Sequence, residues 1–297
     1  MPLPPMTVNP VVNAMAGAVI LDGKAITERM KADLLSEMKQ LGGVPPRLAI
    51  ISFDTPTSQL YLTAQLRQAR ALGITADVEF RFPWNVGQEE VERAVIGLNQ
   101  GEMHGIFVHQ PMPPQVDPQR ISALIDPRKD VEGIHPQNMA RRFFAKARIG
   151  SCTALAVMRL IEETGETVEG KEAVVVGHSE IVGRPVSMLL LDRLATTTVC
   201  HVATQNLQAH VSRADVLVVA VGRPQLIRGG WIKPGAIVID VGINVVGGKV
   251  VGDVEFESAK ARAGYLTPVP GGVGPVTVMM VMKNTVEAFK LQQRERA

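Results

Sequence analysis

The chain has 297 residues, a mass of 32.0 kDa and a net charge of +2 from 31 basic and 29 acidic residues. A hydrophobic fraction of 46% with 20% charged residues excludes a disordered chain, and the length fits one large or two medium domains. With only 4% aromatic residues and no basic run, we expect no nucleic-acid partner. No apolar segment reaches about 18 uncharged residues, so we expect no membrane partner.

Residues 1–17 contain four prolines and no basic segment, so we expect a disordered extension rather than a signal peptide. This favours a cytoplasmic location. Cys152 and Cys200 are too few for a disulfide framework or a four-thiolate zinc site, and they fit a reducing compartment. His135 and His210 form no metal-ligand spacing with an acid or a thiol, so no metal is expected.

From Ala18 onward, predicted strands alternate with predicted helices. The predicted strands span residues 18–24 (with a turn), 47–53, 76–82, 105–110, 172–177, 197–202, 214–222 and 236–242. The predicted helices span residues 25–41, 58–72, 89–100, 153–164, 185–194 and a last segment from about residue 276. This alternation is typical of βαβ units and parallel sheets, and the turn around Gly150 is the expected boundary between two α/β lobes.

One turn between a buried strand and a helix is rich in small residues. Gly177, Ser179 and Gly183 stand there, although Ser179 takes the place of the second glycine of a G-x-G-x-x-G motif and Gly183 comes one residue late. Such a turn allows backbone N–H groups to approach a pyrophosphate at the positive end of a helix. A purely structural turn is the alternative. Gly222 and Gly242, which end two later strands, favour nucleotide binding.

The strand predicted at residues 197–202 ends without two expected features. It lacks the acidic residue that usually binds the ribose of NAD, and it lacks an arginine for the 2′-phosphate of NADP. His178 and His201 are the only candidates for a 2′-phosphate contact, and an ordinary imidazole is mostly neutral at pH 7. The residues themselves leave the choice between NAD and NADP open.

Seven segments match one known family in order and at its spacing, over about residues 18–290. They are TSQLYLTAQ (57–65), VHQPMP (108–113), PRKDVEGIHPQN (127–138), VVVGHSEIVGRPVS (174–187), VIDVGIN (238–244), GDV (252–254) and TPVPGGVGPVTVMM (267–280). Together they resemble the FolD family, the bifunctional methylenetetrahydrofolate dehydrogenase/cyclohydrolases.

The resemblance implies an α/β fold with two lobes. An N-terminal catalytic lobe would span residues 18–150, and a Rossmann-like dinucleotide-binding lobe with a parallel sheet would span residues 151–275. The helix of residues 276–297 would pack back on the first lobe. The resemblance also implies a homodimer that binds tetrahydrofolate derivatives between the lobes and NADP, the family's usual cofactor, on the second lobe. Family members oxidise 5,10-methylenetetrahydrofolate to the methenyl form, and most then hydrolyse it to 10-formyltetrahydrofolate.

The family motifs also imply the site residues. The implied catalytic positions are Tyr61, Gln65, His109 and Glu132. The implied substrate-binding positions are Tyr61, Glu132, Pro270, Gly271 and Gly272. The implied cofactor-binding positions are Gly177, His178, Ser179, Val202, Gly222 and Ile243.

This chain departs from the family pattern inside both sites. The family has a lysine where Gln65 stands, a glutamine where His109 stands, and an aspartate where Glu132 stands. At the cofactor, family members often carry arginine where His178 stands and serine where Val202 stands. Because the Gln65 amide cannot exchange a proton at neutral pH, we expect the lysine-dependent cyclohydrolase reaction to be absent or strongly reduced.

Hydride transfer needs no proton-carrying side chain, so it can survive these substitutions. His109 is a candidate substitute base, or it satisfies a loop hydrogen bond. Three interpretations therefore stay open. The favoured one is a methylenetetrahydrofolate dehydrogenase with weak or lost cyclohydrolase activity. The others are a non-catalytic folate- or nucleotide-binding relative, and an enzyme that acts on another one-carbon pterin.

Overall fold

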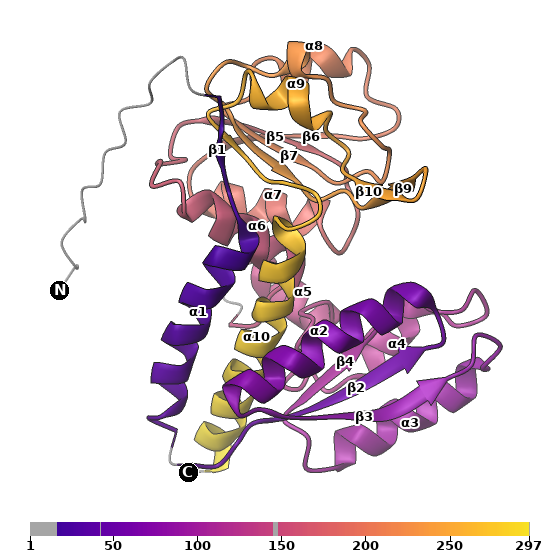
Figure 1. The fold of residues 1–297 in the computed structure, drawn as a ribbon. Helices are drawn as coiled ribbons and strands as arrows, with labels where there is room; N and C mark the ends of the chain where they lie inside the picture. The colour runs from indigo at the N-terminus through magenta and orange to yellow at the C-terminus, as the bar shows by residue number, and fades with distance from the viewer. Residues whose placement is uncertain (1–16, 42, 145–147, 297) are drawn as a thin grey trace. The chain divides into compact units, whose positions relative to one another are not determined.

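The computed structural model describes residues 17–41, 43–144 and 148–296, whose ribbon is shown in Figure 1. Apart from Gly17, the expected N-terminal extension lies outside the described residues. The chain forms two compact units. The six-stranded unit comprises the described residues up to Gly23 together with Val157–His178 and Leu189–Val273. The three-stranded unit comprises Lys24–Ala156, Ser179–Met188 and the described residues from Gly274 onward.

The six-stranded unit is built on a parallel sheet in the order β1-β11-β8-β7-β5-β6. Its strands are β1 (Val19–Ile20), β5 (Glu172–Val176), β6 (Thr196–Cys200), β7 (Val216–Val219), β8 (Ile237–Asp240) and β11 (Tyr265–Leu266). The sequences of strands β5, β7 and β8 are almost continuously apolar, because both faces of a parallel sheet are covered by other parts of the chain. The expected α/β class with a parallel sheet is confirmed.

Smaller elements complete this unit. They are α8 (Leu207–Val211), η1 (Gly229–Trp231), α9 (Phe256–Lys260) and an antiparallel hairpin of β9 (Asn244–Val246) and β10 (Lys249–Val251). Two longer helices, α6 (Cys152–Glu162) and α7 (Gly183–Asp192), each belong partly to this unit and partly to the other. The sequence pattern did not indicate the short elements, because a segment of two to five residues is too short to show a hydrophobic period.

The three-stranded unit carries the parallel sheet β3-β2-β4. Its strands are β2 (Arg47–Phe53), β3 (Thr75–Phe82) and β4 (Gly105–Val108), and its helices are α1 (Gly23–Met38), α2 (Pro56–Leu72), α3 (Gln88–Gln100), α4 (Pro118–Leu124), α5 (Pro136–Phe143) and α10 (Val273–Arg296). On one face, Ala49, Ile51 and Phe53 of β2 share a core with Val91 and Val95 of α3. Figure 1 shows α2 and α3 on opposite faces of this sheet.

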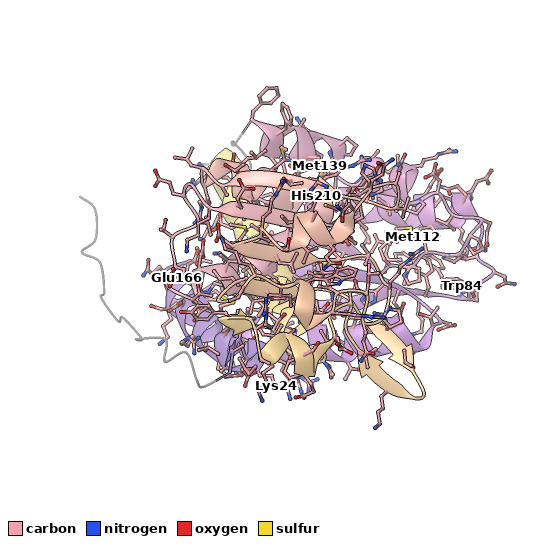
Figure 2. The ribbon with its side chains drawn as sticks, turned by 90° about the horizontal axis from the view of Figure 1, so that it is seen from above. Lys24, Trp84, Met112, Met139, Glu166 and His210 are labelled. Carbon is pink, nitrogen blue, oxygen red and sulfur yellow. The ribbon has the colours of Figure 1, made fainter. Side chains whose placement is uncertain are left out.

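The segment after β3 places an aromatic side chain outside this core. Trp84 is 40% exposed and projects from the unit, whereas Met112, in the segment after β4, is buried (Figure 2). Gln115 holds the two segments together, because its amide donates to the carbonyl oxygens of Trp84 and Val86 at 3.0 and 2.8 Å. Among the described residues, no helix is both long enough and apolar enough to cross a bilayer.

Strand β4 ends two residues earlier than its apolar pattern predicts. His109 N–H still donates to the Ile51 carbonyl at 2.9 Å, but Pro111 has no N–H with which to continue the ladder. The helices α4 and α5 were not predicted, although each carries a clear start signal. Asp117 and His135 accept N–H groups of the first turn, and a proline follows each of them.

A buried amide attaches α10 to the loop segments around Val131 and Gly150. Asn284 Nδ2 donates to the carbonyl oxygens of Val131 and Gly150 at 2.8 and 2.9 Å. The two loop segments also approach each other closely. Gly133 has φ +73°, and a Cβ there would lie 2.2 Å from the Gly150 carbonyl carbon. The position after Val131, which is Glu132, is therefore fixed by contacts between segments far apart in sequence.

Replacing Asn284 with alanine should lower the free energy of unfolding by about 1–3 kcal/mol, because the buried Gly150 carbonyl loses its donor and the Val131 carbonyl keeps only the Cys152 thiol. Urea denaturation of the variant against the parent protein measures this loss. Lys283→Ala is the matched control, since Lys283 is exposed on the same helix and should change stability by less than about 0.5 kcal/mol. Equal stabilities for the parent and Asn284→Ala would contradict the role of the amide.

Candidate active site

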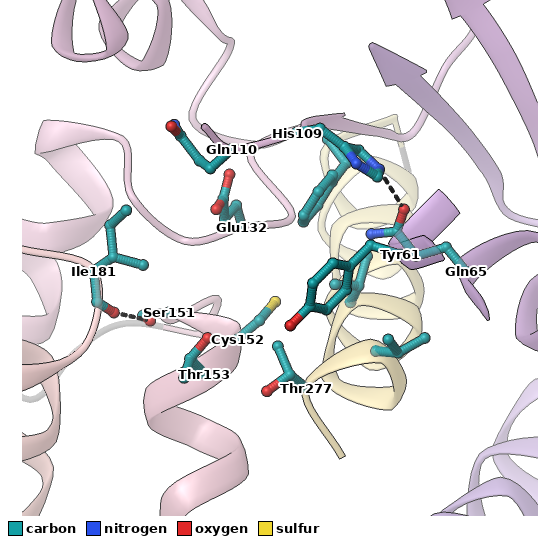
Figure 3. Close-up of a pocket in the computed structure, with 13 residues that line it drawn as sticks. Tyr61, Gln65, His109, Gln110, Glu132, Ser151, Cys152, Thr153, Ile181 and Thr277 are labelled. Atoms are coloured by element: carbon teal, nitrogen blue, oxygen red, sulfur yellow. Dashed lines mark hydrogen bonds between the residues drawn. The ribbon is translucent and has the colours of Figure 1, made fainter. Parts of the chain in front are cut away.

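A cavity of about 220 Å³ lies within the three-stranded unit, where α2, the end of β4, the loop around Glu132 and the starts of α6 and α10 converge (Figure 3). Its lining consists of Tyr61, Gln65, Phe107, His109, Gln110, Glu132, Ser151, Cys152, Thr153, Ile181, Thr277, Val278 and Val281. All four positions predicted to be catalytic are in this lining. The structure therefore brings together Tyr61 and Gln65 from one helix with His109 and Glu132 from two separate loops.

The imidazole of His109 is paired with the amide of Gln65. His109 Nε2 lies 2.8 Å from Gln65 Oε1, and both side chains are buried. Burial lowers the pKa of His109 to about 4, so the ring is neutral at pH 7. Because the facing atom is a carbonyl oxygen, Nε2 carries the proton and donates it to this bond. The other ring nitrogen, Nδ1, is then left as an acceptor.

The residue pairing follows from local geometry. Gln65 faces the cavity from one turn of α2 beyond Tyr61, because positions i and i+4 share a face of a helix. Phe107 and His109 face the cavity together because alternate residues of a strand point to the same side. Their rings meet edge to face with centroids 5.4 Å apart, so Phe107 supplies part of the apolar surroundings of the imidazole.

Glu132 is the only carboxyl group among the described residues that line this cavity. Burial, and to a lesser extent the neighbouring Asp130 carboxylate, together raise the pKa of Glu132 to about 8. Asp130 is itself held by donors, since it accepts the N–H groups of Gly133 and His135 and the amide of Asn138, each at 2.9 Å. No described residue hydrogen-bonds to the Glu132 carboxyl group, and Figure 3 shows no contact drawn to it. At neutral pH it is a protonated acid that a ligand can reach.

The remaining titratable side chains of the lining are also neutral. Burial raises the pKa of the Tyr61 phenol and raises that of the Cys152 thiol well above its usual value, with the Glu132 and Asp130 charges adding to the second effect. Cys152 and Cys200 are buried and form no disulfide bond with each other. That Cys152 lines the pocket was not expected from the sequence. Its thiol donates to the Val131 carbonyl at 3.1 Å and so belongs to the loop that positions Glu132.

Other lining residues also escaped sequence analysis. Gln110 adjoins the predicted position His109, Thr153 follows Cys152 at the start of α6, and Thr277 lies near the start of α10, so no local pattern distinguishes any of them. The predicted substrate positions Pro270, Gly271 and Gly272 lie in the six-stranded unit and are not part of this lining. They form a tight turn, in which a Cβ at Gly272 would lie 2.7 Å from the Pro268 carbonyl oxygen. Their predicted role in substrate binding stays a prediction.

Within the six-stranded unit, four of the six predicted cofactor positions follow the carboxyl ends of parallel strands. Gly177 follows β5, Val202 follows β6, Gly222 follows β7 and Ile243 follows β8. These strands are neighbours in the sheet, so the four positions share one edge, which is where α/β sheets bind nucleotides. Val202 and Ile243 are 92% and 56% exposed, as suits apolar side chains that contact a bound ring.

The turn after β5 requires glycine at its first position. Gly177 has φ +125°, and a Cβ there would lie 2.3 Å from the Ala220 carbonyl oxygen, so only glycine is accommodated. The ring of His178 lies 5.3 Å from that of His201, and both residues are exposed at this edge. Ser179, in the place of a glycine, caps α7: its hydroxyl accepts the N–H groups of Val182 and Gly183 at 3.2 and 3.4 Å.

The fold and the two sets of residues define a two-unit α/β protein, with a small buried pocket in one unit and a nucleotide-binding type of sheet edge in the other. Residues 21–132 match the catalytic domain of tetrahydrofolate dehydrogenase/cyclohydrolase, and residues 151–293 match its NAD(P)-binding domain. The chain belongs to the tetrahydrofolate dehydrogenase/cyclohydrolase family, which confirms the resemblance found in the sequence.

Similar proteins match over nearly the whole chain. The bifunctional protein FolD of Geotalea daltonii is 43% identical over 278 residues, which cover 92% of this chain and 99% of that protein. The crystal structure of FolD from Campylobacter jejuni is 38% identical with a TM-score of 0.88, over 93% of this chain and 99% of that one. The enzyme of Trypanosoma brucei, solved with NADP and an inhibitor, is 40% identical with a TM-score of 0.88, over 94% and 100% of the two chains.

The His109 imidazole should titrate near pH 4 rather than at its usual 6.5, because the buried ring lacks the water that would stabilise its charged form. NMR of the histidine rings, assigned with a His109→Asn variant, measures this value directly. The unfolded chain takes up this proton at about 6.5 and the native chain only at about 4. This residue's contribution to the free energy of unfolding therefore decreases as the pH falls between those values. A native titration near pH 6.5 would contradict the neutral imidazole.

Proposed function

We propose that the protein oxidises 5,10-methylenetetrahydrofolate to 5,10-methenyltetrahydrofolate by hydride transfer to NAD(P), with cyclohydrolase activity weak or lost. Membership of the family across both of its domains supports the dehydrogenase. The observation that carries the second half is the Gln65–His109 hydrogen bond, in which an amide and a neutral imidazole stand where the family has a lysine and a glutamine.

The oxidation step requires little acid–base chemistry from the protein. The nitrogen lone pair beside the methylene carbon drives the hydride out, and no side chain has to give or take a proton. The cofactor accepts this hydride. The protein must hold the donor and acceptor carbons about 3–3.5 Å apart and exclude water. We assign Tyr61 to contact with the pterin ring and Glu132 to the ring's N–H groups, since both side chains line the cavity.

Hydrolysis of the methenyl cation requires proton transfer as well as positioning. A water molecule must lose protons, and a ring nitrogen must accept one, which a positioned acid or base accelerates about 10²–10⁴-fold. The Gln65 amide cannot carry a proton. With a pKa of about 4, His109 is a much weaker base than a group matched to neutral pH. This argues against His109 as the substitute base and supports weak hydrolysis.

For the cofactor we propose NADP, the family's usual partner, held by Gly177, His178, Ser179, Val202, Gly222 and Ile243. The glycine-dependent turn at Gly177 and the exposed positions at the sheet edge support binding of a nicotinamide dinucleotide. The Trypanosoma brucei relative, which forms a complex with NADP, supports the choice of this cofactor. A homodimer in a cytoplasmic, reducing compartment completes the proposal, and two unpaired cysteines are consistent with such a compartment.

Purified protein should form reduced nicotinamide with methylenetetrahydrofolate, while its hydrolysis of methenyltetrahydrofolate at neutral pH should stay close to the buffer rate. Running NAD and NADP in parallel identifies the cofactor by the higher kcat/KM. A folate-binding protein with no reduction of either cofactor would support the non-catalytic alternative instead. Hydrolysis clearly above the buffer rate, and lost in an active-site variant, would refute the weak cyclohydrolase.

The Gln65→Lys variant should raise hydrolysis by at least about 10-fold, because a desolvated amine can exchange protons near neutral pH. Gln65→Met is the matched control, since it has a similar length but carries no proton. The two variants are compared in the methenyltetrahydrofolate assay on matched preparations. If both stay at the level of the parent protein, the missing amine is not what limits hydrolysis.

A further inference from the structure

The described lining of the cavity in the three-stranded unit has titratable side chains but no cationic one. The described residues that line it include four titratable side chains, namely Tyr61, His109, Glu132 and Cys152, but no lysine or arginine. Two of the four, the phenol and the thiol, hold their protons at pH 7, and the imidazole is uncharged. Only Glu132 can become charged near neutral pH, and the charge that it gains is negative.

The proposed substrate and product differ in charge at the reacting carbon. The methylene form is neutral there, whereas the methenyl form is an amidinium cation delocalised over two nitrogens. The 10-formyl form, which hydrolysis produces, is again neutral. A pocket whose lining has no positive side chain and one acid treats these forms differently, because a charge that is moved out of water needs an opposite charge nearby.

We propose that this pocket selects the cationic methenyl form of its ligand over neutral forms, and that Glu132 is the residue that sets this selectivity. The inference rests on the proposed function for the identity of the ligand. It assigns Glu132 a role beyond holding the pterin ring. It also gives Gln65 a positive reason to be neutral, since an ammonium group at that position would repel the cation.

The geometry around Glu132 supports this role. Its carboxyl group has no hydrogen-bond partner among the described residues, so it is available to a ligand. Asp130 is two residues earlier, its charge acts on Glu132, and it is fixed by three donors from Gly133, His135 and Asn138. A second acid is therefore held close to the first, and it adds to the negative potential without needing to move. In a partly enclosed cavity such interactions are screened less by solvent than they are at the open surface.

Selectivity of this kind should depend on pH. With a pKa of about 8, Glu132 is mostly protonated at pH 7, and the cation prefers the ionised carboxylate. Binding therefore releases a proton, so affinity for the cation should rise about 10-fold per pH unit up to about pH 8 and then level off. The other groups that face the cavity are Tyr61 on α2, His109 after β4 and Cys152 on α6, and none of them changes charge in this range. The α10 lining residues Thr277, Val278 and Val281 do not titrate.

Stopped-flow binding of 5,10-methenyltetrahydrofolate, measured before it hydrolyses, and of neutral 5-formyltetrahydrofolate tests the proposal from about pH 6 to about pH 8. The parent protein should prefer the cation by at least about 10-fold at pH 8 and lose most of this preference at pH 6. Glu132→Gln keeps the size of the side chain and should remove both the preference and its pH dependence. Gln65→Lys should weaken binding of the cation and leave binding of the neutral ligand nearly unchanged.

Glu180→Gln is the matched control, because it removes one exposed acid of the same unit that does not line the cavity. It should keep the full preference. Equal affinities for the two ligands in the parent protein, or a preference that survives Glu132→Gln, would overturn the inference while leaving the proposed function intact. If neither ligand binds at any pH, the proposed function fails and the inference fails with it. The pH profile of the parent protein alone decides the question if Glu132→Gln does not fold.

Discussion

The hydrogen bond between His109 Nε2 and Gln65 Oε1 sets the electrostatic character of the pocket. It pairs one nitrogen of a buried imidazole with the oxygen of a buried amide, and neither partner is charged at neutral pH. A lysine in place of Gln65 would bring an ammonium donor against a ring whose protonation is already suppressed by burial. Glutamine at position 65 and histidine at position 109 therefore act as a pair. Together they leave the described residues on this side of the pocket without a group that can exchange a proton at neutral pH.

Glu132 gains its importance from this neutrality. In a pocket with a cationic lysine, a neighbouring carboxylate is stabilised in its charged form and its pKa falls. Here the lining offers no such partner, and Asp130 pushes the pKa of Glu132 upward instead. In the proposed role, the Glu132 carboxyl group is protonated without a ligand and becomes an ionised counter-ion when a cation binds. The extra methylene of glutamate, compared with the aspartate of the family, gives this carboxyl group a longer reach into the cavity.

The division of labour between oxidation and hydrolysis follows from the same property. Hydride transfer creates a cation and needs only geometry, so a neutral pocket with one latent negative charge supports it. Hydrolysis consumes that cation and needs a proton carrier, which the neutral pair does not supply. A pocket that retains the cation while lacking a base therefore favours stopping after the first reaction. The proposed affinity for the product and the proposed loss of the second activity would thus have one physical cause.

The sequence by itself determined the strand and helix alternation, the family and the identities of the altered residues, because hydrophobic periods and motif spacings are local. It predicted the strand at 47–53 to the residue and placed Tyr61, Gln65, His109 and Glu132 at one site. Only the tertiary structure decided the protonation states and partners of these residues. His109 and Gln65 are 44 positions apart, and Asn284 reaches the Glu132 loop across 153 positions. Solvent exclusion, which sets each pKa, arises only when such distant segments pack together.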